Sequence, residues 1–404
     1  MPDTIKKLRG IRIWNEGGGA NVLNPVDGSI AGVIGTAPDA NAEAFPYDAN
    51  VLIISNMAQA LLLGRAGTLL TQIELLFAQG DGNGATIVVR RVEKDADTAV
   101  TTSNFVGSLA AKTGFYGFID AENDVGVKPS LFFAPSYGTA TEDAETKNPV
   151  TVAGQAVADK MHGYLFAEAD SSTKEAAVAW RDLHGHERTH IIAQSVKVWS
   201  VELAVNVTVS ALGLVVGLVL KKDADEGLGK SPENMPVSGI TGLNRAVDFN
   251  LHDPNSEAQY LADHQINCIV HVGGRWVLWG ALLATETVNK QFLKVERVND
   301  FIAGTIQQGF LWAVGMDNSS ALADLILEDV NLMLRELHEA KVILGGKAWW
   351  PPEMNPLTAL IAGKMSIDFD KSIASPMQDL RFRMYENSNY LLADFGRLTT
   401  DVAA

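Results

Sequence analysis

Cysteine is almost absent from this chain of 404 residues, and its single copy is Cys268. That residue lies in the apolar run 266–270, which predicts a buried and inert thiol. One cysteine excludes a disulfide framework within the chain and fits a reducing compartment. The basic residues near the amino terminus are not followed by an apolar stretch or a signal-peptidase site. We therefore expect synthesis in the cytoplasm.

Basic residues are also in short supply, with 32 Lys and Arg against 48 Asp and Glu, a formal net charge of −16. This charge repels phosphate backbones and anionic lipid, so we expect no nucleic-acid partner. The first twelve residues are the exception, because they contain four basic residues, Lys6, Lys7, Arg9 and Arg12, and one acidic residue, Asp3. We expect this basic segment to be attracted to the acidic bodies of other copies of the chain.

Long uninterrupted apolar runs are missing as well. The most apolar stretch, residues 201–220, contains Glu202 and Asn206, which would be costly in lipid. We therefore predict a buried core helix over residues 207–220 and no membrane insertion. The overall composition, 47% hydrophobic and 20% charged, is typical of a folded protein, and the length predicts two or more compact units.

Short β-type runs alternate with helical ones through the first half of the chain. The predicted strands are 30–35, 51–54, 86–92, 130–134, 164–167 and 190–198, with helices over 68–78 and 173–183. This alternation predicts an α/β layered fold with a largely parallel sheet. Farther on, residues 266–272 and 276–283 flank Gly273-Gly274, which predicts a β-hairpin.

A long amphipathic helix is predicted to begin at Ser319 or Ser320 and to end at Gly345-Gly346. Its apolar stripe consists of Leu322, Ile326, Val330, Met333 and Leu337, and its opposite face carries Asp324, Glu328, Asn331, Arg335 and Glu339. Periodicity alone leaves two interpretations of the charged face open: a solvated surface, or a surface that contacts another molecule.

Both ends of the chain are too short to build a core of their own. Extended tails of this kind can add a strand to the exposed sheet edge of a neighbour. The residues we expect in such contacts are Ile11, Ile13, Trp14, Tyr390, Leu391, Leu392 and Phe395. The run Gly17, Gly18 and Gly19 is the candidate hinge, because glycine reorients at little cost.

The segment His186-Glu187-Arg188-Thr189-His190 satisfies the H-E-x-x-H pattern of zinc peptidases. The pattern works only on a helix, where the two histidines share one face and converge on the metal. Here it follows Gly185 and runs into an apolar strand-like segment, which favours a polar turn. A zinc-dependent hydrolase stays an alternative. The chain shows no G-x-S-x-G, Walker or C-x-x-C motif, and we expect no catalytic residue, cofactor or metal.

Several segments resemble the tail sheath proteins of contractile phages and R-type pyocins, in outline from residue 10 and more closely from residue 230. The first are residues 28–39 followed by Phe45-Pro46 and 51–53, then 231–234 with 239–242, and then 266–280. The strongest match is residues 298–369, where the order F-I…WAV, ED-V-N-x-x-L-R-E-L, I-L-G-G, W and G-K-x-x-x-D-F-D is similar throughout. One difference follows Trp279-Gly280, where this chain continues with residues 281–285 instead of the family's polar-Arg-Thr step.

The resemblance implies a structural protein rather than an enzyme. Its copies would stack as six-fold rings in a helical sheath around a tail tube, exchange their terminal arms, and contract to drive the tube through a target envelope. Its partners would be itself, the tube protein, and the baseplate and tail terminator proteins, in a virion tail assembled in the bacterial cytoplasm. A shell protein that assembles without contracting is a further alternative.

With this resemblance the chain divides into five expected parts. They are an amino-terminal arm (1–27), the first part of an α/β core (28–92), an outer α/β domain (93–200), an inner sheath domain (201–384) and a carboxyl-terminal arm (385–404). The resemblance also raises the hypothesis that Asp324, Glu328, Arg335 and Glu339 face the tube.

Overall fold

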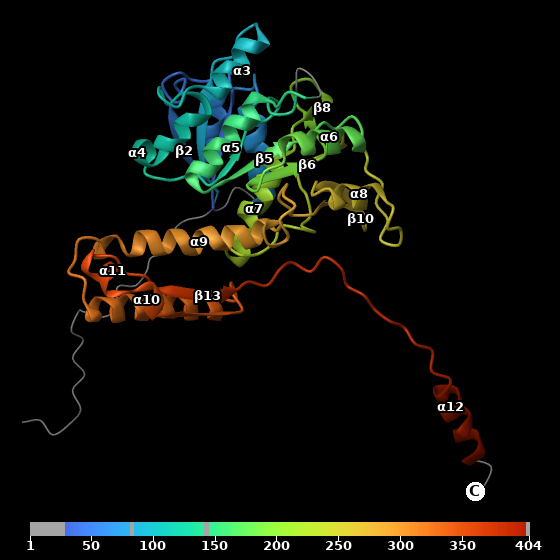
Figure 1. Cartoon of the computed structure of the whole chain (residues 1–404). Coiled ribbons are helices and arrows are strands. Elements are labelled where there is room, and N and C mark those ends of the chain that lie inside the picture. The colour runs from blue at the N-terminus through green and yellow to red at the C-terminus, as the bar shows by residue number, and fades with distance from the viewer. Residues whose placement is uncertain (1–28, 81–84, 141–144, 401–404) are drawn as a thin grey trace, which may run out of the picture. The chain divides into compact units, whose positions relative to one another are not determined.

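The computed structural model describes residues 29–80, 85–140 and 145–400 (Figure 1). The chain divides into two compact units, Met1–Ala374 and Ser375–Ala404. The predicted arm residues Ile11, Ile13 and Trp14 and the predicted glycine hinge lie outside the described residues.

A six-stranded sheet forms the centre of the first unit. Its strand order is β2-β3-β1-β4-β5-β6. The strands are β1 (Ile30–Thr36), β2 (Asn50–Ile54), β3 (Thr86–Val92), β4 (Leu131–Phe133), β5 (Tyr164–Glu168) and β6 (Thr189–Ile192). All neighbouring pairs are parallel except β2 with β3. The predicted α/β fold with a largely parallel sheet is confirmed, and the sheet joins strands from the expected segments 28–92 and 93–200.

Helices cover both faces of this sheet, which explains why every residue of β1 is buried. On one face, Ala31 and Val33 pack in a core with α2 (Leu69–Gly80) and α7 (Leu212–Glu226). On the other, Ile30 and Ile34 pack with α3 (Thr98–Val106) and α5 (Pro149–Met161). The short elements around them are α1 (Met57–Ala60), α4 (Ala121–Val125) and α6 (Lys174–His184).

The glycine pair in α7 allows that helix to cross α2 closely. A Cβ atom at Gly213 would lie 2.4 Å from the Gln72 carbonyl oxygen, and one at Gly217 would lie 2.6 Å from that of Leu76. The small-residue spacing therefore serves a packed crossing inside the core. None of the helices among the described residues is long and apolar enough to cross a membrane.

Two predicted element boundaries between residues 190 and 220 are wrong. The helix expected over 207–220 begins only at Leu212, because the alternating valines before it form β8 (Val205–Val209). The strand expected over 190–198 is interrupted after β6, and β7 (Val196–Ser200) belongs to a second sheet of order β8-β7-β9, in which β9 is Gly242–Leu243. Gln194 lies at this change of sheet, and its side chain binds the backbone of Ile269 at 2.8 and 3.0 Å.

The predicted hairpin is present as β10 (Cys268–Val272) and β11 (Arg275–Trp279), and α8 (Glu257–Asp263) precedes it. Cys268 is 1% exposed, and burial raises the pKa of its thiol to about 12. The prediction of a buried, inert thiol is confirmed.

The last part of the first unit is a thin layer of helices and one hairpin. It contains α9 (Leu293–Gly309), α10 (Ser320–Glu339), β12 (Gly345–Trp349), α11 (Leu357–Ile361) and β13 (Asp368–Ser372). Ser319 caps α10 as predicted, and the apolar stripe contributes Val330 and Met333 to a small core with α9. The predicted helix end is wrong, since Gly345 and Gly346 begin β12. Lys341, with φ of 58°, turns the chain earlier.

The second unit ends in α12 (Asn389–Thr400). Tyr390, Leu391, Leu392 and Phe395, which we expected in an extended strand, are therefore helical and largely exposed in the single chain. Their apolar side chains recur at helical spacing, and leucine is a strong helix former, so local preference favours the helix. Residues 380–385, which precede this helix, contain no strand.

Candidate functional site

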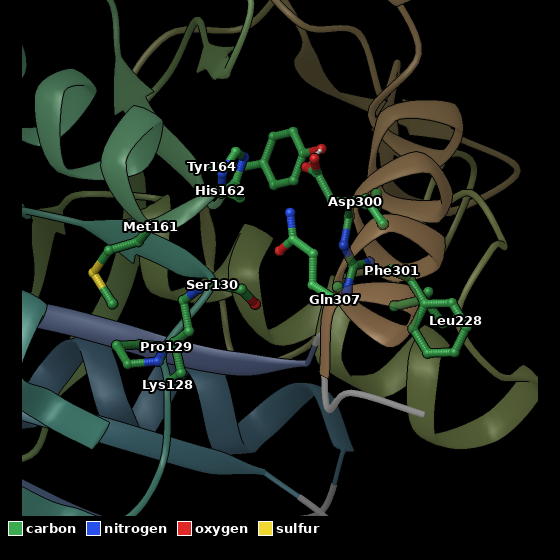
Figure 2. A pocket seen from close by; sticks show the side chains of 13 residues that line it. Lys128, Pro129, Ser130, Met161, His162, Tyr164, Leu228, Asp300, Phe301 and Gln307 are labelled. Carbon is green, nitrogen blue, oxygen red and sulfur yellow. Dashed lines mark hydrogen bonds between the residues drawn. The ribbon is translucent and has the colours of Figure 1, made fainter. Parts of the chain in front are cut away.

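A pocket of about 110 Å³ lies where the parallel sheet meets α9 (Figure 2). One wall comes from the residues that lead into β4 and β5, and the other comes from α9. The lining residues are Lys128, Pro129, Ser130, Met161, His162, Tyr164, Leu228, Arg297, Asp300, Phe301, Ala303, Gly304 and Gln307. Much of the pocket lining is apolar, through Pro129, Met161, Leu228 and Phe301.

A network of three polar side chains closes one side of the pocket. The Tyr164 hydroxyl donates to a carboxylate oxygen of Asp300. Arg188 donates to the same carboxylate from Nη1 and Nη2, at 2.6 and 2.9 Å. Burial and the Asp300 charge raise the pKa of Tyr164 well above its usual value, and the bond to Asp300 raises the pKa of Arg188. The phenol therefore stays neutral and joins β5 to α9.

A second ion pair holds the same face of α9 one turn earlier in the helix. Arg297 donates to Asp223 of α7 at 2.5 and 3.0 Å, and both side chains are 4% exposed. Ser29 donates to Asp223 at 2.7 Å. A paired and nearly dry contact of this type is expensive to break from one side, because a buried charge then lacks its partner. Arg297 thus holds α9 against α7 and the start of β1.

No sequence pattern indicated a site at Tyr164, Asp223, Arg297 or Asp300. Arg188 was noticed only as part of the H-E-x-x-H pattern. The one local signal is that Arg297 and Asp300 are three residues apart, so a helix places both on one face. Nothing in the sequence indicates their partners, which lie far away along the chain.

The H-E-x-x-H segment forms a turn followed by β6, as predicted. His186 and Glu187 lie in the turn, where Nε2 of His186 is 3.2 Å from an Asp159 oxygen and Glu187 binds Lys290 at 2.6 Å. The helix that zinc binding through this pattern requires is not present here. No group of three or more potential metal ligands occurs within residues 29–80, 85–140 and 145–400.

The second histidine of the pattern belongs to the core. His190 is 1% exposed, its ring packs 5.0 Å from that of Phe166, and burial lowers its pKa to about 3. His184 is fully buried at the end of α6. Its ring accepts a hydrogen bond from the Asn148 backbone at 2.8 Å. These two imidazoles pack inside the fold and are not directed towards a shared ligand.

Glu168, at the end of β5, is an acidic group inside the fold. It is 6% exposed and accepts a hydrogen bond from the Ser195 hydroxyl. Burial raises the pKa of Glu168 to about 7, although the bonds from Ser195 and Ser210 oppose the shift. The carboxyl group connects the parallel sheet to Ser195, just before β7, and to Ser210, between β8 and α7.

The predicted charged face of α10 is exposed at Asp324, Glu328, Arg335 and Glu339. Asn331, which we expected on that face, is only partly exposed and points to β12 instead. Its amide accepts from the Ala348 backbone N–H at 2.9 Å and donates to the Ala348 carbonyl at 3.2 Å.

This contact makes the two edges of the β12–β13 hairpin different. Ala348 lies opposite Phe369, and its N–H and C=O groups point away from β13 towards Asn331. In an antiparallel pair the opposite residue is oriented likewise, so the Phe369 backbone groups point away from β12. No further strand among the described residues pairs with β13. Its outer edge is therefore open.

Residues 286–386 match the family model described as the phage tail sheath C-terminal domain. The chain is 26% identical over 393 residues to the tail sheath protein of Escherichia phage P2, covering 95% of this chain and 96% of the relative. The contracted helical sheath of the anti-feeding prophage has a similar fold, with a TM-score of 0.69 and 16% identity over 95% of this chain and 100% of that one. A chain of the six-fold symmetrised baseplate of the same prophage has a TM-score of 0.68 and 17% identity, over 95% of this chain and 100% of that one. The resemblance drawn from the sequence is confirmed.

Proposed function

We propose that this chain, a member of the contractile tail sheath family, is the structural subunit that polymerises helically around a tail tube and contracts. The similarity to sheath proteins over nearly the whole length of the chain supports this role. The proposal includes six-fold stacked rings, contact with tube, baseplate and terminator proteins, and a place in a virion tail assembled in the bacterial cytoplasm. It assigns no enzymatic activity to the chain.

The observation that carries the proposal is the open edge of β13. A strand edge leaves a row of backbone donors and acceptors without partners, and such an edge accepts an extended segment of another chain. We place an arm of a neighbouring copy along β13, with Ile11, Ile13 and Trp14 as the expected contact residues. The carboxyl-terminal residues Tyr390, Leu391, Leu392 and Phe395 would act as a second arm, and α12 would then have to unfold or dock as a helix.

The open edge also explains how a sheath can stay connected during contraction. The parallel sheet and its helices form a packed body that resists deformation. Subunits can then rotate as rigid bodies while strands exchanged between copies keep them linked. Gly17, Gly18 and Gly19 would form the hinge in the arm, and Asp324, Glu328, Arg335 and Glu339 would face the tube.

The test is a proline placed on the open edge. Phe369→Pro removes an outward N–H that an added strand would use, and we expect loss of tubular assemblies in electron micrographs. Phe369→Ala is the matched control, since it removes the same ring and keeps the N–H, and we expect it to assemble. Tubes of normal length from Phe369→Pro would contradict strand addition at β13. Closed shells from the unaltered chain would favour the alternative of an assembly that does not contract.

A further inference from the structure

The pocket beside α9 lies next to the point where the chain enters the parallel sheet. We infer that it is the anchor of the amino-terminal arm, occupied by residues 22–26 of the same chain. The inference concerns where the arm leaves the body, whereas the proposed function concerns where the arm ends.

Two sets of hydrogen bonds bring the start of β1 to the wall of the pocket. The backbone N–H of Ser130 donates to the Ile30 carbonyl at 2.9 Å, and Ser130 lines the pocket. Ser29 binds Asp223, which in turn binds Arg297, another lining residue. Each residue of extended chain spans about 3.3–3.6 Å, so the residues just before Ser29 can reach every part of a pocket this small.

The chemistry of residues 22–26 matches the pocket. Their sequence, Val-Leu-Asn-Pro-Val, contains three aliphatic side chains and no charge. An apolar cavity of about 150 Å³ holds a benzene molecule, so 110 Å³ has room for one large aliphatic side chain. Leu23 fits best, against Met161, Leu228 and Phe301. Pro25 limits the freedom of the unbound segment and lowers the entropy lost when it docks.

The charges at the end of the segment also fit this placement in the pocket. Asp27 is the only ionisable residue between Gly17 and Gly28, and it follows the apolar segment directly. The pocket carries an exposed cation, Lys128, on the wall that precedes β4. An Asp at this position can therefore meet a cation while the valine and leucine side chains enter the apolar part.

An anchor here would divide the arm in two. Residues 22–26 would belong to the body, and the glycine run at residues 17–19 would be the first free part. This consequence rests on the proposed function, while the anchoring is a property of the single chain. Failure of the chain to form tubes would leave the anchor intact, and an empty pocket would leave the sheath assignment intact.

Cysteine cross-linking tests the anchor in the full-length chain. The native Cys268 is buried, so it does not compete for an oxidant. Gln307 lines the pocket, is exposed, and has its amide directed into the pocket in Figure 2, so Gln307→Cys adds a thiol there. This change is combined in turn with Val22→Cys, Leu23→Cys, Asn24→Cys and Val26→Cys, and the products are separated on non-reducing gels and mapped by mass spectrometry. Ala303→Cys serves as a second pocket position.

We expect an intramolecular disulfide at one or two neighbouring positions, with loss of that product when Gln307→Cys is paired with Lys6→Cys. A disulfide-linked dimer in place of the intramolecular product would overturn the inference, because the occupant would then be the arm of another copy. The absence of any disulfide at all four arm positions with both pocket positions would overturn it as well.

Discussion

The six-stranded sheet and the β12–β13 hairpin differ in how completely the chain buries them. Every residue of β1 is buried, and Asn267 closes the outer edge of β6 through hydrogen bonds to its backbone. In the β12–β13 hairpin only Ala348 is buried, and the edge of β13 is open. The comparison teaches that one region satisfies its backbone groups within the chain, while the other leaves a strand edge open, which the proposed function assigns to a segment of another copy.

The largest expected effect is a core truncation in the closed sheet. Phe133 of β4 has no exposed surface, so Phe133→Ala should lower the free energy of unfolding by about 3–5 kcal/mol. Phe369 is 37% exposed in the single chain, and Phe369→Ala should cost under about 1 kcal/mol. Urea denaturation of the unassembled chain measures both values. Equal costs would remove the contrast between the sheets.

The buried ion pair that holds α9 comes next. Arg297→Ala leaves the Asp223 carboxylate without its main cation. We expect a loss of about 3 kcal/mol, at the lower end for buried pairs because the Ser29 hydroxyl still donates to Asp223. Lys112→Ala is the control, since Lys112 pairs with Asp120 at 2.6 Å on the surface and should cost about 0–1 kcal/mol. If both replacements cost the same, α9 is not fixed by this contact.

A similar but pH-dependent effect is expected at Glu168. Its folded-state pKa is raised from 4.5 to about 7, so the unfolded chain loses this proton first as pH rises. Its contribution to stability is therefore full below about pH 4.5, falls as pH rises towards 7, and is constant above. Glu168→Gln should gain up to about 3 kcal/mol at pH 8 relative to its effect at pH 4. A pH-independent difference between the two proteins would contradict a buried ionisable carboxyl group.

The smallest effect on folding is expected on the exposed face of α10. Exchanging charges with Arg335→Glu and Glu339→Arg keeps the net charge and should change the free energy of unfolding by less than about 0.5 kcal/mol. The same exchange should weaken co-sedimentation of the sheath with tail tubes if this face contacts the tube. Unchanged co-sedimentation would leave the face as a solvated surface.

Sequence periodicity predicted the closed region well. The strands β1, β2 and β3 and helix α2 lie within a few residues of their expected positions, because buried strands leave a clear apolar pattern bounded by turns. The errors occurred where two local preferences compete. The sequence of residues 205–209 is compatible with a strand or with the start of a helix. Pairing with β7 stabilises the strand.

The candidate sites were harder to predict for a physical reason. The pocket network depends on Tyr164, Arg188 and Asp300, whose contacts cross from the sheet to α9 and leave no local spacing signal. The difference between the edges of β12 and β13 depends on a single side chain, Asn331, which helical periodicity assigned to the charged face of α10. By contrast, the turn at residues 186–188 was predicted correctly, because it is set by neighbours in the sequence.

The most direct test of the central claim is a high-resolution electron microscopy map of tubes formed by the full-length chain. The account predicts an extended segment of another copy hydrogen-bonded to the outer edge of β13, with backbone bonds to Phe369. A map in which that edge faces solvent, or is covered by a segment of its own chain, would contradict it.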